Sequence, residues 1–311
     1  MAFFSVVIPL YNKENFVENT IKSVLNQHFT DFEILVVEDC STDASLQMVQ
    51  SIQSDKIKII KHPHNKGLSA SRNTGVQNAL SDYICFLDAD DQWETTFLEE
   101  IYHLILLFKN AHLFATNYIE YFSKSVQLLP NNGSKKLNNA SIIDDFFTQS
   151  LSQPLYCPSS VCVKKIVFDS GFWFDQTILF GEDVDFNIRT NLNFKLAYSK
   201  NPLVKYFSDS ENQITKSTLC GKKITDFDFY EKTYRNKNLK IYLDFNRYIM
   251  AKHYKLQRNW QQFHKMKNGI DLINLNYKQK FLLLSPRFVL LALTKFKKFL
   301  LLKKIRITAY D

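Results

Sequence analysis

Apolar residues follow two alternating patterns along the first 110 positions. Short continuous apolar runs are typical of buried strands, and they alternate with segments whose apolar residues recur every three or four positions, which is helical spacing. The expected strands are 5–10, 32–37, 57–61 and 83–87, and the expected helices are 14–27, 43–54, 69–79 and 93–109. This alternation predicts an α/β fold with a mostly parallel sheet covered by helices on both faces.

The pattern becomes less regular after residue 110. The expected elements are a strand over 113–122, a polar loop over 129–139, a helix over 142–150, a strand over 161–164 and a helix over 183–192. From about residue 216 the chain is rich in Lys, Tyr and Phe with helical spacing. We therefore predict an α/β domain over 1–215, with halves at about 1–110 and 111–215, and a helical basic extension over 216–311.

Composition places the chain among globular proteins. Of its 311 residues 45% are hydrophobic and 14% aromatic, which is enough to bury a full core. The five cysteines are odd in number and lack C-x-x-C spacing, so neither a disulfide framework nor a zinc site is indicated, and a reducing cytoplasm is expected. The first nine residues have no basic start and are expected to form a strand instead of a signal peptide. No apolar run approaches the length of a membrane span.

The net charge is +8 and the isoelectric point about 9.0. Such a charge suits nucleic acid, an anionic membrane surface or an anionic substrate. Seven basic residues and no acidic one lie over 287–306, whereas the rest is nearly balanced. Because 281–307 mixes Leu and Phe with these charges, it is a candidate interfacial helix on an anionic leaflet. A helix packed on the protein with solvated lysines stays an open alternative, since the lysines do not share one face.

The strand at 83–87 runs directly into three carboxylates, Asp88, Asp90 and Asp91. No basic residue stands beside them in the sequence, so we expect a bound cation to neutralise them. Ligands bind at the carboxyl ends of strands in an open α/β sheet, and carboxylate oxygens suit Mg²⁺ or Mn²⁺ carrying a phosphate. Taken alone, the motif also fits plain capping of the following helix.

The ends of the first two strands carry further candidates. Pro9-Leu10-Tyr11-Asn12 ends the first strand, and Glu38-Asp39-Cys40-Ser41-Thr42-Asp43 ends the second. An aromatic such as Tyr11 can stack on a nucleobase, and a carboxylate such as Asp39 can accept hydrogen bonds from a base or a ribose. The alternative for Ser41, Thr42 and Asp43 is capping of the next helix, which we expect of one of them in any case.

The loop Asn65–Gly75 leads into a helix. Lys66 and Arg72 supply cations there, and backbone N–H groups gather at the positive end of the helix, as an anion site requires. Both side chains can also be ordinary surface charges.

Four acidic residues fall within the eleven positions from 175 to 185, among bulky aromatic residues. Carboxylates in a partly apolar wall have raised pKa values, which suits a general base. The alternative is that Glu182 and Asp183 only complement the start of a helix.

These segments, in this order and at these separations, resemble glycosyltransferase family 2, the inverting nucleotide-sugar transferases with the GT-A fold. The resemblance covers about residues 4–190 and rests on Val-Val-Ile-Pro-Leu-Tyr-Asn, the acidic turn after the second strand, the loop at 65–75, Asp-x-Asp and Gly-Glu-Asp. It implies a nucleotide-sugar half and an acceptor half within the catalytic domain 1–215. It also implies transfer from a nucleotide sugar, commonly a UDP-sugar, to a glycan or lipid-linked glycan of a surface polysaccharide.

The resemblance implies a role for each matching residue. Asp39 would contact the nucleobase and Asp88 the ribose, while Asp183 would be the catalytic base beside Glu182. A divalent ion, Mn²⁺ or Mg²⁺, would be held by Asp90 with Asp88. The remaining implied nucleotide-binding residues are Pro9, Tyr11, Asn12, Lys66 and Arg72.

Three positions depart from the family pattern. Cys40 stands where a glycine is usual, and we expect the turn to form nevertheless. Ser210 stands where many relatives carry a His, which leaves a third contact to metal or phosphate open. Gln257-Arg258-Asn259-Trp260 does not match the signature of processive synthases, so a single-addition transferase is expected.

Other functional classes fit less well. Sugar nucleotidyltransferases begin with a Gly-rich loop after the first strand, and residues 11–15 contain no glycine. A nucleic-acid binder would explain only the positive charge, because acidic strand ends repel phosphates unless a metal intervenes. A catalytically inactive relative that still binds nucleotide sugars would explain the missing His, although the acidic positions are retained.

Overall fold

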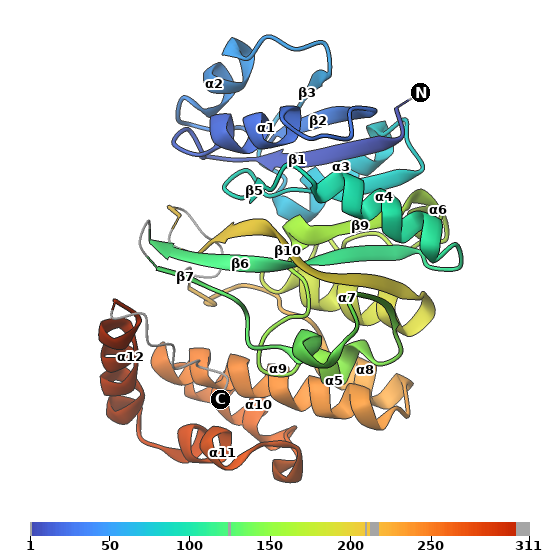
Figure 1. The fold of residues 1–311 in the computed structure, drawn as a ribbon. Coiled ribbons are helices and arrows are strands. Elements are labelled where there is room, and N and C mark those ends of the chain that lie inside the picture. Colours follow the sequence, from blue (N-terminus) through green and yellow to red (C-terminus); the bar gives the residue numbers. More distant parts are fainter. Residues whose placement is uncertain (1, 124–125, 209, 212–217, 303–311) are drawn as a thin grey trace.

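A mixed sheet runs through the middle of the molecule in the computed structural model, which describes residues 2–123, 126–208, 210–211 and 218–302 (Figure 1). Its strands follow the order β3-β2-β1-β4-β9-β6-β10-β5, with β7 beside β6 and β8 beside β10. The strands are β1 (Phe4–Leu10), β2 (Phe32–Glu38), β3 (Ile57–Lys61), β4 (Tyr83–Phe86), β5 (Gln92–Trp93), β6 (Leu113–Ser123), β7 (Val126–Leu128), β8 (Ala140–Ile143), β9 (Val161–Lys164) and β10 (Leu196–Phe207).

Helices cover both faces of this sheet. The helices of the described residues are α1 (Val17–Leu25), α2 (Ser45–Ser51), α3 (Leu68–Asn78), α4 (Phe97–Leu107), α5 (Phe146–Gln149), α6 (Lys165–Asp169), α7 (Glu182–Asn193), α8 (Phe227–Thr233), α9 (Lys237–Leu256), α10 (Trp260–Asn268), α11 (Tyr277–Leu284) and α12 (Arg287–Leu302). Short 3₁₀ turns occur at Gly133–Lys136, Pro158–Ser160 and Leu272–Asn274.

Strand direction separates the two halves of the sheet. The strands β1 to β4 are parallel, as expected, and so are β6 and β10. Strand β9 is antiparallel to both of its neighbours, β4 and β6, and β5, β7 and β8 also pair antiparallel. The predominance of parallel pairs therefore holds for the N-terminal half only, because periodicity locates a strand but does not give its direction.

Three local expectations are corrected. Trp93 lies in β5 instead of a helix, because its backbone pairs with Val204 and its indole N–H donates to the Ser159 carbonyl over 2.7 Å. The segment 142–150 is not one helix: its start pairs with β10 as β8, and only Phe146–Gln149 is helical. Neither Ser41 nor Thr42 caps α2, which begins after Ala44; of the three candidates only Asp43 binds its start, by accepting from the Ser45 N–H over 2.9 Å.

Side chains of β1 alternate between two hydrophobic layers, as a strand covered on both faces requires. Phe4, Val6 and Ile8 pack against α1 and α4, and Val7 joins the layer formed by α3, α6 and α7. Gly75 of α3 lies so close to β1 that a Cβ there would be 2.2 Å from Val7 Cγ1. A glycine at this position therefore lets α3 reach the sheet.

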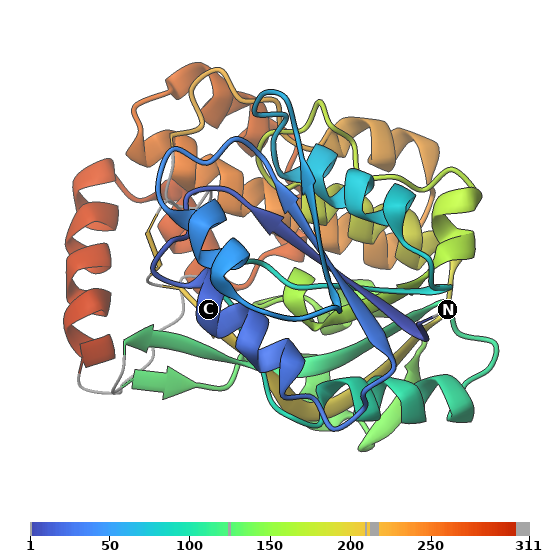
Figure 2. The same cartoon turned by 90° about the horizontal axis from the view of Figure 1, so that it is seen from above.

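The C-terminal helices share the hydrophobic layer of α7. Buried side chains of α9, such as Leu239 and Leu243, belong to it, and the Tyr242 ring lies 5.5 Å from that of Phe147. Figures 1 and 2 show α12 at the edge of the molecule in both views. The boundary near residue 216 falls outside the described residues, so the division into domains stays a prediction. No helix in the described part of the chain is both long and apolar enough to cross a membrane.

Candidate active site

The carboxyl ends of β1 and β2 are joined by Asn12. The Thr42 backbone N–H donates to Asn12 Oδ1 over 2.7 Å, and the Asn12 N–H donates to Ser41 Oγ over 3.2 Å. Tyr11 is 43% exposed at this edge, as a stacking platform requires, whereas Pro9 is buried within β1. Two of the residues that were expected to cap α2, Ser41 and Thr42, thus fix the loop after β1 instead.

Asp39 anchors the loop that leads into α3. Its carboxylate accepts from the backbone N–H groups of Lys66 and Gly67 over 2.7 and 2.8 Å, and it lies 2.7 Å from His62 Nδ1. The next residue, Cys40, has φ 60°, so the turn forms in the left-handed region without glycine, as expected. The Lys66 side chain is exposed at the same edge of the sheet.

Arg72 is fully buried and joins the two halves of the site. Its Nη2 lies 2.8 Å from Asp88 Oδ1, and its Nη1 lies 3.1 Å from Glu182 Oε1. Burial opposes the charge of the guanidinium, but the Asp88 and Glu182 carboxylates outweigh burial and raise its pKa. The end of β4 and the start of α7 are therefore held together by one side chain.

Asp90 is bound by groups from two distant segments. Lys13 Nζ lies 2.7 Å from Asp90 Oδ2 and donates to the Glu211 carbonyl over 2.6 Å, and the Ser210 hydroxyl also donates to Asp90. Part of the charge at this acidic edge is therefore balanced by basic side chains of the protein itself, while the expected cation stays a prediction. Lys13 and Arg72 are remote from the motif in sequence, but they supply counter-charges to Asp90 and Asp88.

Asp91 has a structural position. It is almost completely buried and accepts from Ser159 Oγ over 2.5 Å and from the Phe207 N–H over 2.9 Å. Burial raises its pKa well above the ordinary value, and the charges of Asp90 and Asp88 raise it further. Asp91 ties the end of β10 to this loop and does not cap α4, which begins after Thr96.

The donor groups at this edge fit a divalent cation. Among the described residues, no three His, Cys, Asp or Glu side chains are grouped closely enough to form a metal site by themselves. Mg²⁺, however, commonly takes only one or two carboxylates from the protein and completes its shell with water and phosphate. Asp88 and Asp90 supply two such carboxylates, and each uses one oxygen to bind a basic side chain.

Glu182 and Asp183 form the first turn of α7, after Gly181 with φ 73°. Burial raises the pKa of Glu182 to about 7, the charge of Asp183 adds to the shift, and Arg72 opposes it. Burial also raises the pKa of Asp183, which is partly exposed and accepts from the Val184 N–H over 2.9 Å. A partly exposed carboxylate with a raised pKa has the properties of a general base.

Sequence reasoning missed two members of this site. Lys13 directly follows the recognised Tyr-Asn pair, and His62 directly follows β3, so both stand at strand ends where ligand-facing groups gather. Their position at strand ends is the sequence feature that could have identified them. Their partners, Asp90 and Asp39, are far away in sequence.

Residues 5–151 match the model of the family described as glycosyl transferase family 2. This segment is a family 2 glycosyltransferase domain. Among curated relatives, the chain is 32% identical over 120 residues to the UDP-Glc:alpha-D-GlcNAc-diphosphoundecaprenol beta-1,3-glucosyltransferase WfaP of Escherichia coli, covering 39% of this chain and 48% of WfaP. It is 30% identical over 199 residues to the minor teichoic acid biosynthesis protein GgaA of Bacillus subtilis, and the match covers 59% of this chain and 42% of GgaA.

The chain is also 35% identical over 118 residues to the glycosyltransferase GlyA of Streptococcus pneumoniae. This match covers 38% of this chain and 17% of GlyA. The match therefore covers less than half of each of these relatives. Among solved structures, residues 1–349 of Staphylococcus aureus TarS in complex with UDP-GlcNAc align with a TM-score of 0.60 at 17% identity, covering 90% of this chain and 78% of that one. The expected GT-A fold is confirmed.

The raised pKa of Glu182 predicts a pH-dependent stability. The folded state holds the Glu182 proton more tightly than the unfolded chain, so the free energy of unfolding should fall by about 3 kcal/mol as pH rises from about 4.5 to about 7. Glu182→Gln removes the titrating proton and should flatten this part of the profile in urea unfolding. Asp55→Asn, at an exposed carboxyl, should keep the wild-type slope. An unchanged slope in Glu182→Gln would contradict the assignment.

Proposed function

We propose that the protein is an inverting glycosyltransferase that moves a sugar from a UDP-sugar to an acceptor hydroxyl during assembly of a cell-surface glycan. The observation that carries this proposal is Arg72, which binds both the Asp88 carboxylate and the Glu182 carboxylate beside Asp183. Arg72 thereby joins the strand ends of the family 2 segment, residues 5–151, to a candidate base that lies beyond this segment.

The relatives support a uridine donor and a glycan acceptor. WfaP uses UDP-Glc and acts on a diphosphoundecaprenol-linked GlcNAc, GgaA takes part in minor teichoic acid biosynthesis, and TarS was solved with UDP-GlcNAc. Tyr11 offers an exposed stacking surface for the nucleobase at the end of β1. Asp39 is buried and binds the Lys66 and Gly67 N–H groups and His62, so a nucleobase N–H would share its carboxylate with these groups. The acceptor class we propose is a glycan or a lipid-linked glycan.

In the proposed mechanism, the acceptor hydroxyl attacks the anomeric carbon from the face opposite the leaving UDP, through an oxocarbenium-like transition state. Asp183 takes the hydroxyl proton as the new bond to carbon forms, because its raised pKa makes it a better proton acceptor than an ordinary carboxylate. The bond from the anomeric carbon to the phosphate oxygen breaks, and its electron pair leaves with UDP. Inversion at the anomeric carbon follows.

Replacement of the base tests this mechanism. Asp183→Asn should lower the rate of sugar transfer about 10²–10⁴-fold, because the amide cannot take the proton, while UDP affinity should change little. Transfer is measured as UDP release from a panel of nucleotide sugars with Mn²⁺, and affinity by calorimetry. Asp169→Asn, at an exposed carboxyl, is the control and should behave as wild type. Loss of UDP binding in Asp183→Asn would place this residue in donor binding instead.

We further infer that a divalent ion, Mn²⁺ or Mg²⁺, would be held by Asp90 with Asp88. When bound, such an ion neutralises charge on the leaving diphosphate. Lys13 occupies one oxygen of Asp90 with its ammonium group, so the ion and Lys13 compete for the same carboxylate.

This competition has a measurable result. Lys13→Met should raise the affinity of the UDP-bound protein for Mn²⁺ about tenfold, since a favourable ion pair no longer has to be broken, and Asp90→Asn should abolish Mn²⁺ binding. The Mn²⁺ affinity of both variants is measured by calorimetric titration. In a separate turnover assay, a chelator tests whether sugar transfer requires the metal. The metal assignment fails if Mn²⁺ binds neither wild type nor Lys13→Met and turnover withstands the chelator.

The C-terminal helices support contact with an anionic membrane surface. Tyr277, Phe281 and Leu284 of α11 share one helix face and are 77%, 62% and 59% exposed, and Phe288 of α12 is 72% exposed. Residues 272–302 contain six basic residues and no acidic one. Apolar side chains in contact with water beside positive charge fit an interface with anionic lipid. The residues of the candidate segment beyond 302 lie outside the described part of the chain.

Vesicle sedimentation tests this surface. Wild type should sediment with phosphatidylglycerol-containing vesicles at low salt and much less with phosphatidylcholine alone, because the basic residues attract anionic lipid. The double variant Phe281→Asp/Phe288→Asp should lose most of this binding. Leu107→Asp, at an equally exposed apolar site on α4, should not. Equal binding of wild type and the double variant would exclude these helices as the contact.

A further inference from the structure

A cavity of about 740 Å³ lies beside α7, away from the predicted donor site. It is formed by the end of α3, the segment 173–178, the middle of α7 and the segment 223–230. Tyr11, Asp39, Asp88, Asp90 and Asp183 are not among its lining residues. Its volume lies within the range of ligand pockets, which is about 300–1,000 Å³.

Phe174 lies between this cavity and the Arg72 network. Its ring stacks on Phe186 with centroids 4.1 Å apart, and Arg72 Cζ lies 5.3 Å from its centroid. Asn73 fixes the Phe174 backbone, because its side chain accepts from the Phe174 N–H over 3.1 Å and donates to the Phe174 carbonyl over 2.9 Å. The cavity is therefore close to the site but separated from it by an aromatic wall.

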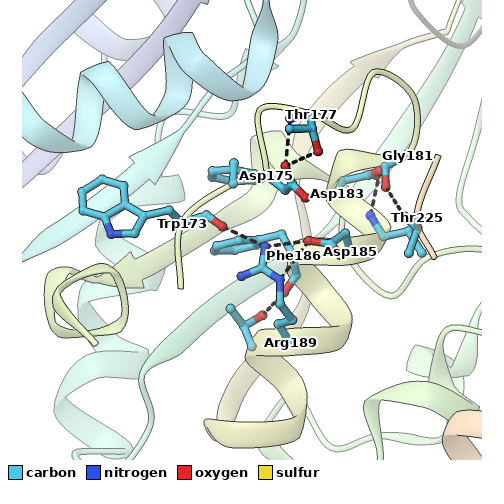
Figure 3. Close-up of polar contacts among 12 residues, drawn as sticks. Trp173, Asp175, Thr177, Gly181, Asp183, Asp185, Phe186, Arg189 and Thr225 are labelled. Carbon is cyan, nitrogen blue, oxygen red and sulfur yellow. Dashed lines mark hydrogen bonds and ion pairs between the residues drawn. The ribbon is translucent and has the colours of Figure 1, made fainter. Parts of the chain in front are cut away.

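Charged side chains that line the cavity already have partners within the protein, as Figure 3 shows in part. Arg189 donates to Asp185 over 2.6 Å and to the Trp173 carbonyl over 2.8 Å, so the guanidinium is already engaged. Lys223 donates to the Thr177 hydroxyl over 2.6 Å. These contacts make the cavity a poor site for a phosphate or another strong anion.

The remaining surface combines aromatic rings with hydrogen-bonding groups. Phe229 is 55% exposed at the cavity, and Trp173 is partly exposed. Asp175 binds the Thr177 N–H and hydroxyl through Oδ1, so its Oδ2 can accept from a ligand. The exposed amides of Gln77 and Gln176 offer donors and acceptors. Sugars need this combination, because their apolar C–H faces pack on rings and their hydroxyls require polar partners.

We propose that this cavity binds a neutral sugar unit of the acceptor glycan, at a distance from the hydroxyl that reacts. That the bound sugar belongs to an acceptor glycan rests on the proposed function. The sugar-binding property of the cavity is a separate claim that is tested without turnover.

The test uses the purified full chain and neutral trisaccharides, namely maltotriose, cellotriose and chitotriose, by saturation-transfer NMR and calorimetry. At least one trisaccharide should bind, and saturating UDP should leave this binding in place. Phe229→Ala should weaken it about five- to tenfold through loss of ring contact, and Gln176→Ala should weaken it less. Leu179→Ala, at an exposed apolar residue of the neighbouring loop outside the cavity, is the matched control and should bind as wild type.

Two results would overturn the proposal. One is that none of the trisaccharides binds the wild-type protein. The other is binding that UDP displaces and Phe229→Ala leaves unchanged, which would place the sugar in the donor site. UDP release from the panel of nucleotide sugars with Mn²⁺ is measured in the same variants. Its absence from every donor in wild type would contradict the proposed transfer reaction and leave the trisaccharide result standing.

Discussion

The site depends on the buried charge of Arg72. A guanidinium removed from water is costly unless carboxylates surround it, and loss of one partner of a buried ion pair typically costs about 3–5 kcal/mol. The sheet brings Asp88 from the end of β4, and α7 brings Glu182 from a segment 110 residues away. Gly75 sets the depth of α3 against β1, so Arg72 is held where both carboxylates can reach it.

This arrangement balances charge within the protein before a donor binds. Lys13 pairs with Asp90, and Arg72 pairs with Asp88 and Glu182. Burial raises the pKa of Asp91, which disfavours its charged form. An edge with several carboxylates would otherwise repel a diphosphate. The acidic residues and their basic partners therefore form one electrostatic unit, and a donor that enters it must exchange contacts with that unit.

The C-terminal helices position the candidate base as well as covering the sheet. The Thr225 hydroxyl donates to the carbonyl of Gly181, the residue before α7, and the Tyr230 hydroxyl of α8 donates to Asp185. Phe186 of α7 stacks between Phe168 and Phe174 in the shared hydrophobic layer. The first turn of α7, with Asp183, is thus fixed by residues that precede α7 in the chain and by residues of the C-terminal part.

The sequence by itself determined the strands of the N-terminal half, the polar residues at their ends and the start of α7, because these features depend on neighbours along the chain. It also identified the turn at Cys40. Tertiary structure alone decided that Lys13 meets Asp90 across 77 positions, that β9 reverses direction and that Trp93 joins β10. These contacts are long-range, and no local periodicity encodes which distant group will neutralise a buried charge or complete a strand edge.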